Sequence, residues 1–117
     1  MKVITLLLLS LFVIGCNAQN CKELKQFKSF EEALVEIKNS DFNIKETADV
    51  LKSSWIKNAN FYSCDESVGY LIIMTSKRKE YIHENVPLYL WRQFRNSDSL
   101  GKFYNSNFKN KYKLQLK

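Results

Sequence analysis

Three consecutive segments set the architecture of this 117-residue chain: VGYLIIMT at residues 68–75, SKRK at 76–79 and EYIHENV at 80–86. The first segment is almost entirely apolar, which is typical of a strand in the middle of a sheet. The basic quartet is short and polar enough for a hairpin connection, and the third segment has the length and residue types of a returning strand. These residues therefore predict an antiparallel hairpin.

The residues before this hairpin extend the sheet. Residues 54–62 alternate, with Trp55 and Phe61 among the side chains on one side, and residues 64–67 predict a turn. Three antiparallel strands joined by short turns form a meander. Residues 42–51 leave two alternatives open, a short fourth strand or an extended connection.

A helix is expected before the strands. Ser29 and Glu32 fit a capping box, and apolar residues follow at helical spacing, which predicts a helix over residues 30–39.

Two short helices are expected after the strands. Pro87 suits the first turn of one of them, because that position needs no amide donor. The other is predicted over residues 99–108, with Ser97 or Asp98 as its cap, and residues 109–117 are expected to form a Lys-rich tail that is loose at its end. The expected fold class is α+β: an antiparallel β-meander of three or four strands, two short C-terminal helices, and one N-terminal helix packed on the sheet.

The N-terminal residues have the features of a secretory leader. Lys2 is the single charge within residues 1–20, and residues 3–15 are apolar or small apart from one Thr and one Ser. Thirteen helical residues cover about 20 Å, whereas the core of a bilayer needs about 30 Å. We therefore interpret residues 1–15 as a signal peptide and residues 16–28 as a tether to the folded part.

Cys16 follows this leader directly. The sequence Val13-Ile14-Gly15-Cys16 resembles the lipobox of bacterial lipoproteins, in which the Cys thiol is acylated and becomes the mature N-terminus. Each buried CH₂ of an acyl chain contributes roughly 0.8 kcal/mol, so several chains on one residue anchor firmly. The resemblance implies a lipoprotein of the cell envelope, anchored in a membrane and facing the periplasm or the exterior. Two alternatives stay open, secretion after cleavage near Ala18 and an uncleaved helix.

The remaining two cysteines are Cys21 and Cys64. In an exported chain such an even pair predicts a disulfide bond. The bond would close a loop of 44 residues, from 21 to 64, which the chain-entropy model values at about 4 kcal/mol. The alternative is a pair of buried thiols.

The net charge of +6 is unevenly distributed along the chain. Residues 21–76 hold seven Lys and Arg against nine Asp and Glu, whereas residues 77–117 hold ten against three. A basic half of this kind suits phosphate, anionic lipid or an acidic partner. The simpler interpretation is a solvated face, since Lys stems cover apolar surface while their ammonium groups stay in water.

Several short motifs of the C-terminal half occur in the order found in one family. They are Ser53-Ser54-Trp55-Ile56, Gly69-Tyr70-Leu71-Ile72-Ile73, Tyr81-Ile82-His83 with Val86-Pro87, and Leu100-Gly101-Lys102-Phe103-Tyr104-Asn105 with Lys109 and Tyr112. Over residues 53–112 the chain resembles the KTSC domain, a small module named from its occurrence at the C-terminus of some lysyl-tRNA synthetases. The family usually has Tyr-x-Tyr at the third motif, so His83 stands in place of the second tyrosine.

The resemblance implies a module of unknown function. RNA binding has been suggested for the family from its association with synthetases, but an exported chain does not meet cytoplasmic tRNA, and a shared fold does not fix function. The N-terminal helix with its extension (29–52) and the Cys21–Cys64 pair lie outside the family core, and residues 113–117 form a tail.

The residues favour no catalytic chemistry. His83 is the only histidine, no G-x-S-x-G motif is present, and the adjacent acids Asp65 and Glu66 lie in a predicted turn. The three glycines are isolated, so no phosphate-binding loop is predicted. Two cysteines and one histidine lack the short paired spacings of a zinc site. We therefore expect no enzyme, no cofactor and no metal.

A binding surface is the function that the remaining residues favour. The candidate face combines Tyr81, His83, Tyr104, Asn105 and Lys109. The first hypothesis is a monomeric accessory module displayed at the cell envelope, whose partner is a protein or an envelope polymer. The alternative is extracellular nucleic-acid binding through the basic C-terminal half, because aromatic rings stack on bases and ammonium groups bind phosphates.

Overall fold

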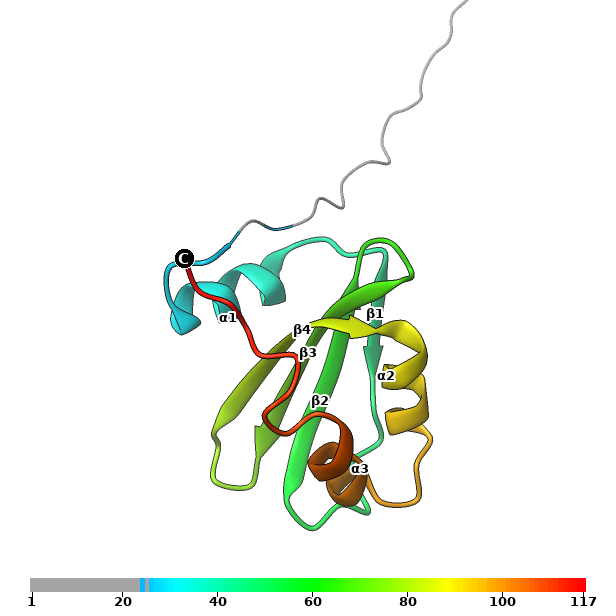
Figure 1. Ribbon diagram of the computed structural model, residues 1–117. Helices are drawn as coiled ribbons and strands as arrows, with labels where there is room; N and C mark the ends of the chain where they lie inside the picture. The colour runs from blue at the N-terminus through cyan, green and yellow to red at the C-terminus, as the bar shows by residue number, and fades with distance from the viewer. Residues whose placement is uncertain (1–23, 25) are drawn as a thin grey trace, which may run out of the picture.

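The computed structural model describes residue 24 and residues 26–117 (Figure 1). Its elements are α1 (Phe30–Asn39), β1 (Ile44–Thr47), β2 (Ile56–Ser63), β3 (Val68–Thr75), β4 (Glu80–Pro87), α2 (Leu88–Arg95) and α3 (Leu100–Asn107). The strands form one antiparallel sheet in the order β1-β2-β3-β4. The α+β prediction is confirmed, and the open question about residues 42–51 is answered by β1, the fourth strand.

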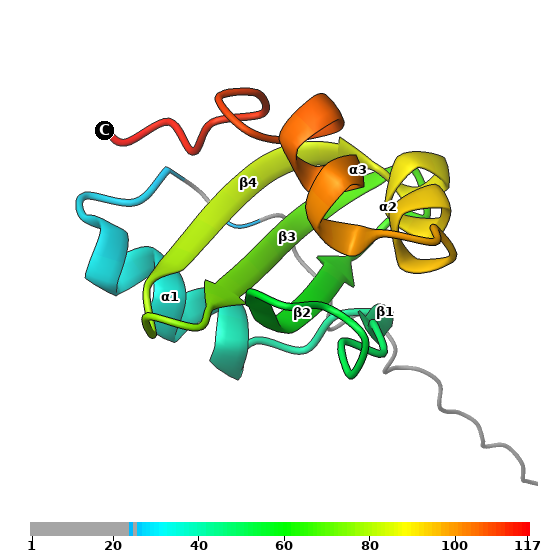
Figure 2. The same cartoon turned by 90° about the horizontal axis from the view of Figure 1, so that it is seen from below.

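The sheet is covered on both faces, as Figure 2 shows: α1 lies on one face, and α2 and α3 lie on the other. The larger core is on the side of α2 and α3, where Trp91, Phe94 and Phe108 are fully buried. The Phe61 ring of β2 stacks on Trp91 with centroids 5.4 Å apart. A smaller core joins α1 to the other face through Ala33, Ile37, Ile72 and Ile82, together with Phe27.

Local signals explain where the first helix and the two turns lie. The Ser29 hydroxyl accepts a hydrogen bond from the amide of Glu32 at 3.0 Å, which confirms the predicted cap of α1. In the β2–β3 turn, the Asp65 carboxylate accepts from the amides of Ser67 and Val68. These bonds, the one from Ser67 first, hold the pKa of Asp65 below its usual value, so this carboxylate stabilises the turn.

The predicted starts of α2 and α3 need correction. Pro87 is the N-cap of α2 and also the last residue of β4, so it precedes the first turn. The cap of α3 is Ser99, whose hydroxyl accepts from the amide of Lys102. Neither of the two predicted caps has that position, because the Ser97 hydroxyl turns back to the Phe94 carbonyl and Asp98 is exposed.

The predicted alternation in β2 is interrupted by a β-bulge. The register with β3 shifts between Ile56 and Asn58. The residues that face the larger core are therefore Ile56, Ala59 and Phe61, each fully buried. Trp55 precedes the strand and is only half-buried, because the bulge changes the phase on which the prediction depended.

The C-terminal segment is docked, which corrects the expectation of a loose tail. Lys113 forms an antiparallel bridge with His83 of β4, and Leu116 forms a parallel bridge with Phe27. The Lys117 amide also donates to the Phe27 carbonyl at 2.8 Å. Phe27 is 2% exposed, so the end of the predicted tether belongs to the folded part.

The predictions for the leader fall outside the described residues. These are the signal peptide over 1–15, the acylated Cys16 and the disulfide partner Cys21. Within residue 24 and residues 26–117, no helix has the length and apolar character that crossing a membrane requires.

Candidate binding groove

All five residues of the predicted face line one groove of about 620 Å³, hereafter the α3–β4 groove. Tyr81 and His83 come from β4, two positions apart and therefore on the same side of the strand. Tyr104 and Asn105 come from α3, and Lys109 follows the end of that helix. Figure 2 shows why they meet: α3 lies over the sheet and the segment after it runs along β4.

His83 and Tyr104 form the floor of this groove as a hydrogen-bonded pair. His83 Nε2 lies 2.8 Å from the Tyr104 hydroxyl, and Nδ1 lies 2.8 Å from the Lys111 carbonyl. A carbonyl only accepts, so Nδ1 carries the proton, and the neutral ring accepts at Nε2 from the Tyr104 hydroxyl. The two residues are 5% and 6% exposed, so their polar atoms are occupied by each other and by the backbone.

Burial keeps both groups of this pair neutral. It lowers the pKa of His83, although the carbonyl of Lys111 opposes the shift. It also raises the pKa of Tyr104 to about 12. Neither group is charged near pH 7, so a hydrogen bond between two neutral side chains holds α3 over β4.

Trp55 was not part of the predicted face, but it forms a wall of the groove. Its ring meets the edge of Tyr104 with centroids 5.7 Å apart. A Cβ atom at position 101 would collide with the Trp55 indole nitrogen, so Gly101 allows the ring to lie against α3. The backbone of Trp55 is tied to the β3–β4 turn by a bond from the Ser76 amide to its carbonyl at 2.8 Å.

The rim of the groove is basic. Lys77 of the β3–β4 turn and Lys113 of the C-terminal segment join Lys109 there, and none of the described residues that line the groove is Asp or Glu. Lys79 places its ammonium group 5.7 Å from the centroid of the Tyr81 ring. Tyr81 is 38% exposed. The charge excess of residues 77–117 was the sequence signal for this rim, but it did not identify which lysines converge.

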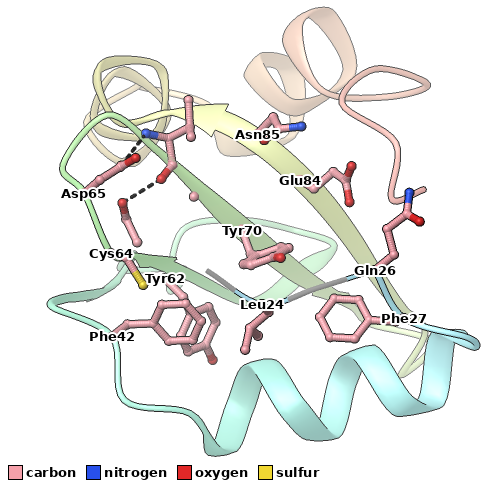
Figure 3. A pocket seen from close by; sticks show the side chains of 13 residues that line it. Leu24, Gln26, Phe27, Phe42, Tyr62, Cys64, Asp65, Tyr70, Glu84 and Asn85 are labelled. Carbon is pink, nitrogen blue, oxygen red and sulfur yellow. Dashed lines mark hydrogen bonds between the residues drawn. The ribbon is translucent and has the colours of Figure 1, made fainter. Parts of the chain in front are cut away.

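A second cleft, of about 200 Å³, lies on the face of the sheet that α1 covers (Figure 3). Phe42 packs against Tyr62 and Tyr70 with ring centroids 5.6 and 6.2 Å apart, and Phe27 contacts Tyr70. Cys64 lines this cleft at the end of β2. Its predicted partner, Cys21, lies outside the described residues, so the pairing stays a prediction.

A cluster of charged side chains that joins α2 to β1 has a structural explanation. Glu46 of β1 accepts from the Trp91 indole at 2.7 Å, from Arg92 at 2.7 Å and from Arg95 at 2.9 Å. The bond from Arg92 is the first cause that lowers the pKa of Glu46. Across the described part of the chain, no group of three or more His, Cys, Asp and Glu side chains is placed to hold a metal ion.

Comparison with known proteins agrees with this fold and these motifs. The KTSC domain model matches residues 52–112, which is 61 of the 117 residues, and the chain therefore belongs to the KTSC domain family. Neither the curated proteins nor the solved structures gave a significant match.

Proposed function

We propose that this protein is a lipoprotein of the cell envelope whose KTSC domain is a non-catalytic binding module. Its binding face is the α3–β4 groove, and its partner is an envelope protein or polymer. The observation that carries the proposal is the convergence of Tyr81, Asn105 and Lys109 on one groove with a basic rim.

The proposed location in the cell envelope rests on the sequence of the leader. An apolar stretch too short to cross a bilayer ends at Cys16 in a lipobox-like motif. Export would also provide the oxidising environment in which Cys21 and Cys64 pair.

The binding role rests on the difference in burial between the residues of the groove. His83 and Tyr104 are buried and saturated by hydrogen bonds, so they shape the floor. Tyr81, Asn105 and Lys109 are exposed, so their polar atoms and ring are available to a partner. Exposed aromatic and charged residues around a concavity are typical of ligand sites.

Intact-mass analysis of the membrane fraction tests the proposed lipid anchor and location. We expect a chain that begins at Cys16, carries acyl groups, and is two hydrogens lighter because Cys21 and Cys64 are joined. Recovery of the full-length reduced chain from the cytosol would refute both the envelope location and the disulfide.

Affinity capture from detergent-solubilised envelope tests the groove. Tyr81→Ala combined with Lys109→Ala should abolish recovery of the partner, while Tyr104 is left intact because its ring supports the fold. The matched control is Tyr89→Ala with Lys45→Ala, an exposed pair outside the groove. Equal recovery by the two double variants would reject this face.

The nucleic-acid alternative is supported by the same basic rim and differs in its response to salt. Phosphate contacts release counterions, so affinity for an oligonucleotide would fall steeply between 50 and 200 mM salt. Binding that is absent at low salt, or that does not change with salt, eliminates this alternative.

A further inference from the structure

The cationic rim of the α3–β4 groove selects for a negatively charged ligand. Lys77 comes from the β3–β4 turn, Lys109 and Lys113 come from the segment after α3, and all three are exposed. The ion pairs found within the described residues involve other cations, so no carboxylate there neutralises these three. Uncompensated ammonium groups around one concavity attract an anion and stabilise it once bound.

The surfaces between these lysines suit a sugar ring. Trp55 and Tyr81 line the groove with aromatic rings, whose faces are negative and attract the C–H groups of a pyranose. Asn105 and Asn110 add exposed amides, each with donor and acceptor atoms that match neighbouring hydroxyls. On the basis of the binding function proposed above, we infer that the α3–β4 groove binds an acidic saccharide, a sugar unit of an envelope polysaccharide that carries a carboxylate or an ester anion.

An extended peptide is disfavoured because the sheet edge beside the groove is already occupied. Peptides that bind sheets usually add a strand to a free edge and form main-chain hydrogen bonds there. Here the amide of Glu84 donates to the Tyr112 carbonyl at 2.9 Å, and His83 pairs with Lys113. Recognition next to His83 therefore depends on side chains, which is the usual situation for a saccharide.

A nucleic-acid strand is disfavoured because the positive surface is interrupted. Trp55 stands between the groove and a neighbouring cleft at the start of α3, and it lines both. That cleft contains Lys52, Lys102 and Arg95, of which Arg95 is paired with Glu46, but also Asp49 and Asp98. A phosphate backbone that continued past Trp55 would meet two carboxylates, whereas a short saccharide remains within the groove.

Tryptophan fluorescence of the full-length protein in detergent provides the test. Trp91 is fully buried and Trp55 is half-buried in the groove wall, so a ligand-dependent change reports on Trp55. The probes are polygalacturonate, dextran sulfate, neutral dextran, polyglutamate and an oligodeoxythymidylate. We expect saturable binding of at least one of the two acidic saccharides, at least tenfold tighter than polyglutamate or the oligonucleotide, and no binding of neutral dextran.

The variants link this signal to the groove. Lys109→Ala with Lys113→Ala should weaken saccharide binding at least tenfold, whereas Lys45→Ala with Lys57→Ala removes the same charge from exposed positions elsewhere and should have no such effect. Equal binding of polyglutamate, tighter binding of the oligonucleotide, or binding of neither acidic saccharide would overturn the inference. A partner still captured through Tyr81 and Lys109 in those cases would leave the proposed function standing.

Discussion

Replacing Tyr104 by Phe removes the hydroxyl that joins α3 to β4 and leaves the ring in place. The ring keeps its contacts with Trp55 and Phe108, so no cavity forms. The loss is the 2.8 Å bond to His83 Nε2. Because His83 is 5% exposed, its acceptor is left largely shielded from water, and such a buried unsatisfied group costs about 1–3 kcal/mol. We expect the free energy of unfolding to fall by about 2 kcal/mol.

Urea unfolding followed by circular dichroism measures this change. The midpoint should decrease while the slope stays constant, because the surface exposed on unfolding is the same. For a domain of this size, about 2 kcal/mol also corresponds to a melting temperature lower by roughly 10 °C. Tyr89→Phe is the matched control, since Tyr89 is 66% exposed and its hydroxyl has ample water. A Tyr104→Phe variant within about 0.5 kcal/mol of the parent, the range of surface substitutions, would refute the reasoning.

Three further predictions concern stability. Burial lowers the pKa of His83 from 6.5, so below about pH 6.5 the unfolded chain binds more protons than the folded one. The free energy of unfolding therefore decreases as the pH is lowered, until the pKa of the folded state is reached. His83→Gln should remove this pH dependence from a series of thermal melts. Glu46→Ala leaves the buried Trp91 indole N–H without its acceptor and should cost about 2 kcal/mol in urea unfolding, whereas Glu46→Gln keeps an acceptor and should cost less; the reverse order would contradict this account. Gly69→Ala places a methyl group 2.8 Å from the Phe61 ring and against a backbone carbonyl, so overpacking should cost about 1–3 kcal/mol, and an unchanged melting temperature would disprove it.

The sequence predicted the elements that depend on local chemistry. Ser29 and the apolar spacing behind it were sufficient for α1, and the apolar run at residues 68–75 was sufficient for β3. The cap of α3 was missed because three polar residues in succession, Ser97, Asp98 and Ser99, are all good caps. The choice among them depends on how the chain leaves α2, which composition does not specify.

The features that the sequence did not predict depend on contacts between distant segments. The bulge in β2 is visible only in the pairing with β3, and it moves Trp55 out of the core phase and onto α3. The docking of the C-terminal segment depends on bridges to His83 and Phe27. Its four lysines suggested a solvated end, because charged side chains are usually exposed. Their charge carries no information about whether the backbone pairs with a strand.

The candidate site was predicted in its members but not in their roles. The five residues of the predicted face do converge, yet Tyr104 and His83 are buried, and only the other three offer groups to a partner. Periodicity places Tyr81 and His83 on one side of β4, but it cannot reveal that α3 covers one of them and leaves the other exposed. Lys77 and Lys113 were within the charge excess and had no feature that distinguished them from other lysines.

The division between floor and rim separates two kinds of effect that an alanine scan would otherwise mix. His83 and Tyr104 hold α3 over β4, so changing either one alters the free energy of unfolding and, through it, the shape of the groove. Tyr81 is 38% exposed and Lys109 is exposed, so changing them should alter binding with a smaller loss of stability than changing the floor. A variant set in which binding falls only in proportion to stability would mean that the groove has no recognition role of its own, because every loss would then be explained by unfolding alone.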